Sequence, residues 1–131
     1  MSHLPHIVIF NPDQWRGDVL GHMGNPAAVT PHLDRLAAEG CNFRNAFTVS
    51  GVCSPSRAEF FSGKYGHQCG APQIIWNNHT FRMNERPFPA LLHDAGYYAA
   101  HIGKWHLGEG QKQKEGYDYW WQCFKSHSMV G

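Results

Sequence analysis

Cys53 and Arg57 are four residues apart in the stretch Cys-Ser-Pro-Ser-Arg. The stretch predicts a loop that enters a helix, since Pro55 suits a first helical turn, Ser54 an N-cap and Gly63 a helix end. Cys53 would then lie just before a helix N-terminus, where free backbone N–H groups favour negative charge. Arg57 could reach back along the same side of the first turn. These residues predict a reactive sulfur and a fixed cation at an anion site, and they leave open a buried structural cysteine before an ordinary helix.

A second candidate pair, Lys104 and His106, lies in the segment Gly-Lys-Trp-His-Leu-Gly of residues 103–108. In an extended segment these two side chains point to the same side, because side chains alternate along the chain. A cation and a titratable imidazole would then face one spot between two conformationally permissive glycines. Two exposed polar residues at the edge of a strand are the alternative.

The third candidate pair is Asp13-Gln14. It follows an apolar, β-branched run over residues 6–10, which predicts a buried strand of a parallel sheet ending at the turn signal Asn11-Pro12. In open α/β sheets, ligands bind at the carboxyl ends of the strands. The pair is therefore expected at a ligand-binding edge, although a turn or helix-capping role remains an alternative.

The rest of the chain supplies elements that could position these residues. Thr30 as N-cap and Gly40 as end predict a helix over 31–39, with its apolar face at Leu33, Leu36 and Ala37. A further helix is expected from Pro89 to a stop at Gly96, strands over 41–49 and 97–102, and a long loop over 63–86. Phe43, Phe47 and Val49 are core candidates, whereas His67, Trp76 and His79 are taken as ordinary loop residues. The alternation of strands and helices predicts the α/β class.

Cys-Ser-Pro-Ser-Arg resembles the Cys-x-Pro-Ser-Arg signature of the sulfatase family, and Asp13-Gln14 and residues 103–108 fall where that family has its own motifs. The resemblance runs from about Ile7 to the C-terminus. It implies an alkaline-phosphatase-like α/β sandwich with a mixed, largely parallel sheet flanked by helices. Residues 1–131 would form the N-terminal part of the catalytic domain, an incomplete sandwich without its C-terminal remainder.

The resemblance also implies roles for the candidate residues. In sulfatases the motif cysteine is oxidised to formylglycine, whose hydrate is the nucleophile. Cys53, Arg57, Lys104 and His106 would be catalytic, and Arg57 and Lys104 would also bind the sulfate. Asp13, Gln14 and the modified Cys53 would bind a divalent metal. Ca²⁺ is expected first, because a neutral amide oxygen suits a hard cation, with Mg²⁺ or Mn²⁺ as alternatives.

The implied activity is the hydrolysis of sulfate esters, as in arylsulfatases, with this chain inactive alone. The expected partners are a small sulfate ester or a sulfated glycan, and the formylglycine-generating enzyme. Asp13-Gln14 also resembles a branch with phosphonate monoester hydrolases, so a phosphonate or phosphate ester hydrolase is the first alternative. A non-catalytic remnant that binds an anion or a partner chain is the second.

Composition narrows the function classes further. The net charge of +1 and the lack of a basic run give no indication of nucleic acid binding, and no apolar stretch approaches the roughly 20 residues of a membrane helix. No signal peptide is visible, which predicts a cytoplasmic protein, or a periplasmic or secreted one if a signal was removed. The four cysteines form no Cys-x-x-Cys pair, so a structural zinc site is not expected. Their even number permits disulfides, but none is expected at Cys53 because of its place in the Cys-Ser-Pro-Ser-Arg motif.

Overall fold

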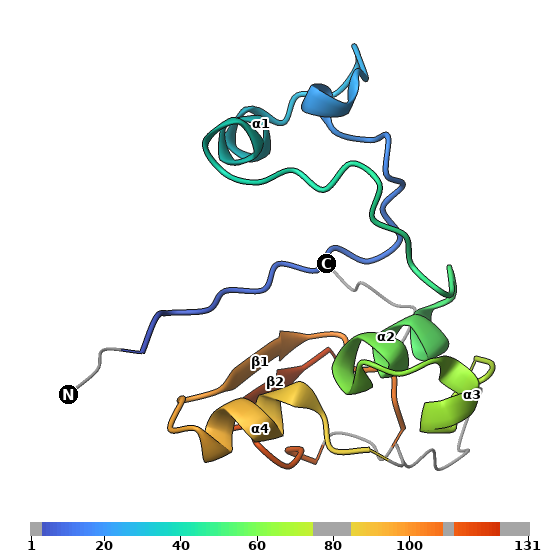
Figure 1. Cartoon of the computed structure of the whole chain (residues 1–131), viewed down its shortest axis with the longest axis vertical. Helices are drawn as coiled ribbons and strands as arrows, with labels where there is room; N and C mark the ends of the chain where they lie inside the picture. Colours follow the sequence, from blue (N-terminus) through green and yellow to red (C-terminus); the bar gives the residue numbers. More distant parts are fainter. Residues whose placement is uncertain (1–3, 75–84, 109–111, 124–131) are drawn as a thin grey trace. The chain divides into compact units, whose positions relative to one another are not determined.

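The computed structural model describes residues 4–74, 85–108 and 112–123 (Figure 1). The chain divides into two compact units, which are described separately. The smaller unit is His6–Phe47, and the larger unit consists of Met1–Pro5 and Thr48–Gly131. Within the described ranges, no helix has the length and apolar character needed to cross a membrane.

The smaller unit contains a short 3-10 helix, η1 (Gly21–Met23), and the helix α1 (Pro31–Glu39). Asp34 connects them, because its Oδ1 accepts a hydrogen bond from the backbone N–H of His22 at 2.9 Å and lies 3.0 Å from the His22 ring Nδ1. The helix predicted over 31–39 is confirmed. Its predicted apolar face is only partly covered, since Leu36 remains 65% exposed.

The two strands predicted before and after α1 are wrong. Residues 6–10 and 41–49 contain no strand, and their apolar side chains are exposed. Val8 is 90% exposed, and the core candidates Phe43 and Phe47 are 77% and 89% exposed. A strand requires a hydrogen-bonded neighbour, and the only strand pairing in the described part of the chain lies elsewhere. Neither the apolar run of residues 6–10 nor the alternation of residues 41–49 therefore produced a strand.

The larger unit contains three helices followed by two strands. In chain order these are α2 (Cys53–Ser62), α3 (Gly66–Cys69), α4 (Phe88–Asp94), β1 (Ala100–Gly103) and β2 (Tyr119–Gln122). The long loop predicted over 63–86 thus contains one helical turn, α3. Trp76 and His79 lie outside the described residues. The helix predicted from Pro89 is confirmed as α4, and the strand predicted over 97–102 is present in shorter form as β1.

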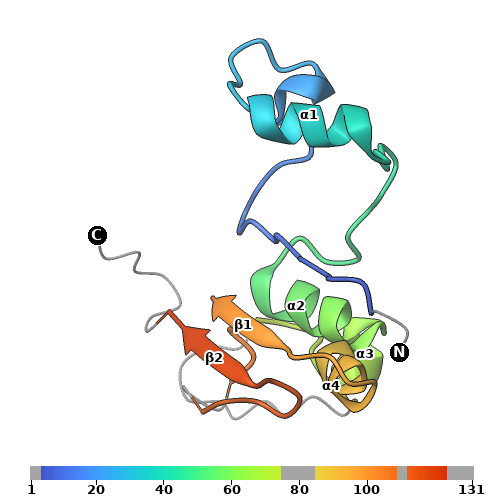
Figure 2. The ribbon, with the colours of Figure 1, turned by 90° about the vertical axis from the view of Figure 1, so that its left-hand side faces the viewer.

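β1 and β2 form a parallel pair in which Ala100 is opposite Tyr119 and His101 is opposite Trp120. The helices of the larger unit lie to one side of this pair (Figure 2). Exposure alternates along both strands accordingly, and Ile102 and Trp121 are exposed at 73% and 52%. Because both strands run in one direction, their carboxyl ends meet at one edge, which is the edge that Lys104 follows.

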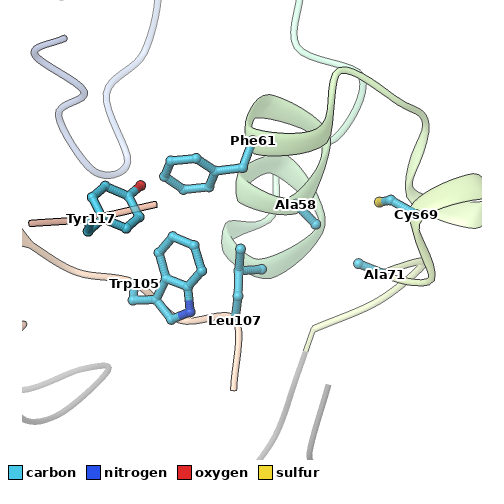
Figure 3. Packing of buried hydrophobic residues seen from close by; sticks show 7 residues of the cluster. All are labelled: Ala58, Phe61, Cys69, Ala71, Trp105, Leu107 and Tyr117. Atoms are coloured by element: carbon cyan, nitrogen blue, oxygen red, sulfur yellow. The ribbon is translucent and has the colours of Figure 1, made fainter. Parts of the chain in front are cut away.

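The core joins α2 to the segment after β1 (Figure 3). Phe61 of α2 extends toward Trp105 and Tyr117, and its ring centroid lies 4.8 Å from that of Trp105. On another side of the same helix, Ala58 faces Cys69 and Ala71 (Figure 3). Burying a large aromatic side chain contributes roughly 1.5–3 kcal/mol. The segment that carries Lys104 and His106 is therefore attached to the helix that begins at Cys53.

Candidate active site

Cys53 is the first residue of α2, and Val52 is the N-cap, so the helix begins two residues earlier than a Ser54 cap predicts and includes Cys53. Ser54 is instead completely buried, because α2 packs with its first turn against the core. Gly63 ends the helix with φ of +67°, as predicted. Cys53 is half-buried at the positive end of the helix dipole, where an anionic group is stabilised.

Arg57 is 9% exposed, one turn beyond Cys53. Its Nη1 donates a hydrogen bond to the backbone carbonyl oxygen of Lys104 at 2.5 Å. A hydrogen bond from a charged donor contributes about 1.5–3 kcal/mol, and a buried charge left without such bonds is strongly unfavourable. Arg57 therefore both places a cation beside the start of α2 and fixes the backbone of Lys104.

The segment after β1 alternates in burial. Trp105 and Leu107 are buried at 5% and 3% exposure, whereas Lys104 and His106 are half-buried. The segment is not simply extended, however, because His106 has φ of +57°. The expectation of a regular extended segment is therefore wrong at His106. The left-handed conformation is unfavourable for a residue with a Cβ, so the packing of Trp105 and Leu107 must compensate for it.

The two glycines that flank this segment take conformations that other residues rarely adopt. Gly103 has φ of +126° and Gly108 has φ of +76°. The expectation that conformationally permissive glycines flank the segment on both sides is confirmed. The chain can thereby leave β1, place Trp105 in the core and turn away again within six residues.

Asp13 and Gln14 belong to the smaller unit and form an exposed turn. Gln14 has φ of +57°, which marks a locally strained backbone at a predicted ligand position. Next to this turn, Arg16 and Asp18 form an exposed ion pair of 2.6 Å. Because the pair belongs to one unit and Cys53 to the other, their grouping stays a prediction.

The predicted metal ligands can be tested against the chemistry of the donors present. Asp13 and Gln14 offer hard oxygen atoms, the donor type that Ca²⁺ and Mg²⁺ prefer. Among the described residues, no group of three His, Cys, Asp or Glu side chains could hold a metal ion. The donor type therefore fits the predicted metal, and the two residues would supply two of its ligands.

All four cysteines of the larger and smaller units are free thiols. Cys69 is completely buried and its thiol donates to the Gly66 carbonyl oxygen at 3.6 Å. Cys53 is half-buried, so its thiol is the more accessible of the two. A hollow of about 370 Å³ also borders the start of α2, lined by the uncharged residues Ser50, Val52, Pro55, Pro72, Gln73 and Ile74.

His101 was not singled out from the sequence, yet it packs directly beneath the Lys104 segment. Its ring stacks on Trp120 with centroids 4.4 Å apart and meets Trp105 edge-on at 5.6 Å. The available signal was a histidine in an otherwise apolar strand, and that signal alone does not separate a core residue from a surface one.

The sulfatase family model matches residues 5–129. An ulvan-active sulfatase of Formosa agariphila is 38% identical over 130 residues, which cover 94% of this chain and 25% of that protein. An N-acetylglucosamine-6-O-sulfatase of Bacteroides thetaiotaomicron is 36% identical over 116 residues, covering 88% of this chain and 20% of that protein. A structure solved with its substrate D-glucosamine-2-N,6-O-disulfate superposes with a TM-score of 0.69 at 36% identity, over 82% of this chain and 21% of that one.

The chain thus spans about a quarter of the length of the curated relatives it matches. Within that span, the similarity covers both the helix that begins at Cys53 and the segment that follows β1. The structural match confirms the predicted alkaline-phosphatase-like α/β class. Because the family model covers nearly the whole sequence, this chain belongs to the sulfatase family.

Proposed function

We propose that the site residues of this chain serve in the hydrolysis of sulfate esters, and that the substrate is a glycan or sugar with a 6-O-sulfated amino sugar. The names of the similar proteins support this substrate class: a curated relative is an N-acetylglucosamine-6-O-sulfatase, and a similar solved structure contains a glucosamine 2-N,6-O-disulfate. The uncharged hollow beside α2 offers room for part of the organic group, whereas the sulfate needs the cations.

The observation that carries the proposal is the hydrogen bond from Arg57 to the Lys104 carbonyl oxygen. It joins the start of α2 to the segment that holds Lys104 and His106. A sulfate ester resists attack because anionic oxygens surround its sulfur, so a site must offset that charge. Arg57 and Lys104 supply two cations, which bind sulfate oxygens through charge-assisted hydrogen bonds. His106 is placed to hold or release a proton at its imidazole.

A formylglycine and a divalent metal complete this proposal. Converted to formylglycine by a formylglycine-generating enzyme, Cys53 would supply a hydrated aldehyde as the nucleophile. A divalent metal, with Ca²⁺ as the first choice, would polarise the sulfate oxygens. Asp13 and Gln14, together with the modified Cys53, are the residues that would hold it. Half-buried at a helix N-terminus, Cys53 is compatible with both roles.

Mass spectrometry tests the proposal at its central residue. Trypsin releases Cys53 in the peptide of residues 45–57, which ends at Arg57. We expect a fraction of this peptide to carry an aldehyde that reacts with a hydrazide probe. The corresponding Cys69 peptide is the internal control and should keep its thiol. An unmodified thiol at Cys53 after coexpression with the formylglycine-generating enzyme would contradict the proposal.

A phosphonate or phosphate monoester hydrolase is the second candidate function, and Asp13-Gln14 is the observation that favours it. The protein that carries this sequence should be assayed with an aryl sulfate and the phosphonate ester of the same leaving group. We expect a higher kcat/KM for the sulfate, because the Lys104 and His106 segment resembles the sulfatase motif. A clear preference for the phosphonate would establish the second candidate instead.

A further inference from the structure

His101 lies at the centre of an aromatic cluster on the covered side of the sheet. Trp120 is its partner in the strand register, which places the two rings in a stacked pair at 4.4 Å and 23°. Trp105 and Tyr117 meet the imidazole edge-on, at 5.6 and 5.7 Å. Three aromatic rings therefore contact the imidazole: Trp120 from β2, Tyr117 from the turn before β2, and Trp105 from the segment after β1.

Three buried polar atoms of this cluster have no hydrogen-bond partner among the described residues. His101 forms a hydrogen bond with the backbone of Gly103, the residue at which the chain leaves β1. Its Nε2 is buried and has no hydrogen-bond partner among the described residues. The indole N–H groups of Trp105 and Trp120 are in the same condition. A neutral imidazole tolerates such surroundings, whereas a second ring proton would need an acceptor or water.

The segment above His101 is held at three points. Trp105 packs between His101 and Phe61, at 5.6 and 4.8 Å. The Lys104 carbonyl oxygen accepts from Arg57, and Gly103 interacts with His101 itself. His106 keeps a left-handed backbone with φ of +57° within this arrangement. A change at His101 can thus reach Lys104 and His106 through Trp105, which is adjacent to both in the sequence.

We propose that His101 is a positioning residue, which as a neutral imidazole holds the Gly103–Leu107 segment so that Lys104 and His106 face the site, and which releases that segment when it is protonated. The reading of Lys104 and His106 as site residues rests on the proposed function. The packing role of His101 does not depend on it. His101 would thereby set an acid limit to the ordered state of the site.

On balance, the surroundings of the imidazole favour its neutral form. Burial lowers the pKa of His101 below its ordinary value of 6.5, the positive charge of Arg57 lowers it further, and the hydrogen bond with Gly103 raises it in part. Stacking on Trp120 opposes this lowering in part, because an aromatic face attracts a cation. The other titratable group in contact is Tyr117, whose pKa burial raises, so it stays neutral. The nearby Asp118 carboxylate accepts from Ala99 N–H and lies 3.4 Å from His93.

The sign of the pH dependence follows from linkage. A histidine whose pKa is lower in the folded state adds stability that is complete above the unfolded value of about 6.5. That stability is lost as the pH falls from there through the lowered pKa of the folded state. The ordered segment is therefore expected at neutral pH and its loosening on the acid side of 6.5.

Heteronuclear NMR of the isotope-labelled 131-residue chain tests the proposal. The His106→Gln variant is used as the background, so that His106 itself does not titrate near the reporters. We expect the His101 ring signals to titrate below pH 6.5, and the Gly103 amide and the Trp105 indole N–H to shift with the same midpoint. His101→Phe, added to that background, keeps an aromatic ring and should abolish the shared transition. His93→Asn, at an exposed histidine of the same unit, should leave it unchanged.

Two results would overturn the proposal: a His101 midpoint at or above 6.5, or Gly103 and Trp105 signals that titrate equally in the His101→Phe variant. If His101→Phe fails to fold, the shared midpoint in the His106→Gln chain decides alone. Turnover is a separate readout. In the protein that carries this sequence, kcat/KM for a sulfate ester should fall by up to about tenfold per pH unit below the His101 midpoint, and this fall should be absent in His101→Asn. If the protein that carries this sequence shows no turnover, the proposed function fails, whereas the NMR result still decides the role of His101.

Discussion

The Nη1 of Arg57 lies 2.5 Å from the backbone carbonyl oxygen of Lys104, and this contact joins two segments that are 47 residues apart in the sequence. It makes Arg57 a structural residue as well as a candidate ligand of the sulfate. A guanidinium has five N–H donors, so it can bond to a backbone carbonyl oxygen and also serve in anion recognition.

We expect Arg57→Met to lower the free energy of unfolding of the larger unit by about 2 kcal/mol, since it keeps the stem but removes the charged hydrogen bond. Urea unfolding followed by near-UV circular dichroism measures this change. Arg86→Met is the matched control in the same unit, and its exposed ion pairs with Asp94 and Glu115 predict little change. Equal effects of the two substitutions would show that the Lys104 contact adds no stability.

Gly116 is expected to tolerate no side chain. It has φ of +83°, and a Cβ at this position would lie 2.2 Å from the Ala90 Cα of α4. Gly116→Ala should therefore cost at least about 2 kcal/mol, from backbone strain and from overpacking.

Two glycines of the same unit provide controls for this measurement. Gly63 also has positive φ, at +67°, but a Cβ there would meet nothing within 4 Å, and Gly51 has the same open surroundings without positive φ. Thermal unfolding should rank the losses as Gly116→Ala, then Gly63→Ala, then Gly51→Ala. A loss at Gly116 no larger than at Gly63 would contradict the close packing against α4.

The contact between η1 and α1 should weaken in acid. The hydrogen bond from the His22 backbone lowers the pKa of Asp34 from 3.8, and burial opposes this in part. A carboxyl group with a lowered pKa adds stability that is complete above its unfolded value and is lost as the pH falls through the folded one. Hydrogen exchange at the His22 amide should therefore accelerate below pH 3.8.

Asp34→Asn should show fast exchange at His22 already at neutral pH, because the amide oxygen is a weaker acceptor than the carboxylate. Asp18→Asn, an exposed carboxylate of the same unit, is the control and should leave the exchange at His22 as it was. Slow exchange at His22 in Asp34→Asn would mean that backbone contacts alone hold η1 against α1.

Calcium binding by the 131-residue chain should be weak. Ca²⁺ usually takes six to eight oxygen ligands, and its affinity rises with the number of charged ones. Asp13 is the one carboxylate among the predicted ligands, so water would fill most positions. Isothermal titration calorimetry should give a dissociation constant well above micromolar, with no heat left in Asp13→Asn. Micromolar binding that survives Asp13→Asn would place the metal on other residues.

The parts of the fold that the sequence predicted are those with local signals. α1 and α4 have proline near their first residues, and α2 and α1 end at or beside a glycine, so the starts of α1 and α4 and the ends of α1 and α2 follow from local sequence. Cys53, Arg57, Lys104 and His106 were singled out through short motifs that lie within residues 5–129, the range that the sulfatase family model matches. None of these predictions required knowledge of which segments would pack together.

The strands were less predictable, because a strand depends on a partner distant in the sequence. Residues 6–10 form an apolar run and residues 41–49 alternate in hydrophobicity, yet in the described part of the chain only β1 and β2 pair as strands. The buried stripe of α2 was also hidden, because it includes Ser54 and Arg57 beside Ala58 and Phe61. Hydrophobic periodicity cannot reveal a stripe that is half polar.

The sequence by itself determined which residues could carry chemistry: a cysteine and an arginine one helical turn apart, and a lysine and a histidine between two glycines. Only the tertiary structure decided how they are held. It placed Trp105 against Phe61, brought the Arg57 guanidinium to the Lys104 carbonyl and put His101 beneath them. These contacts depend on burial and on long-range packing, whose free energy is set by surfaces that meet only after the chain has folded.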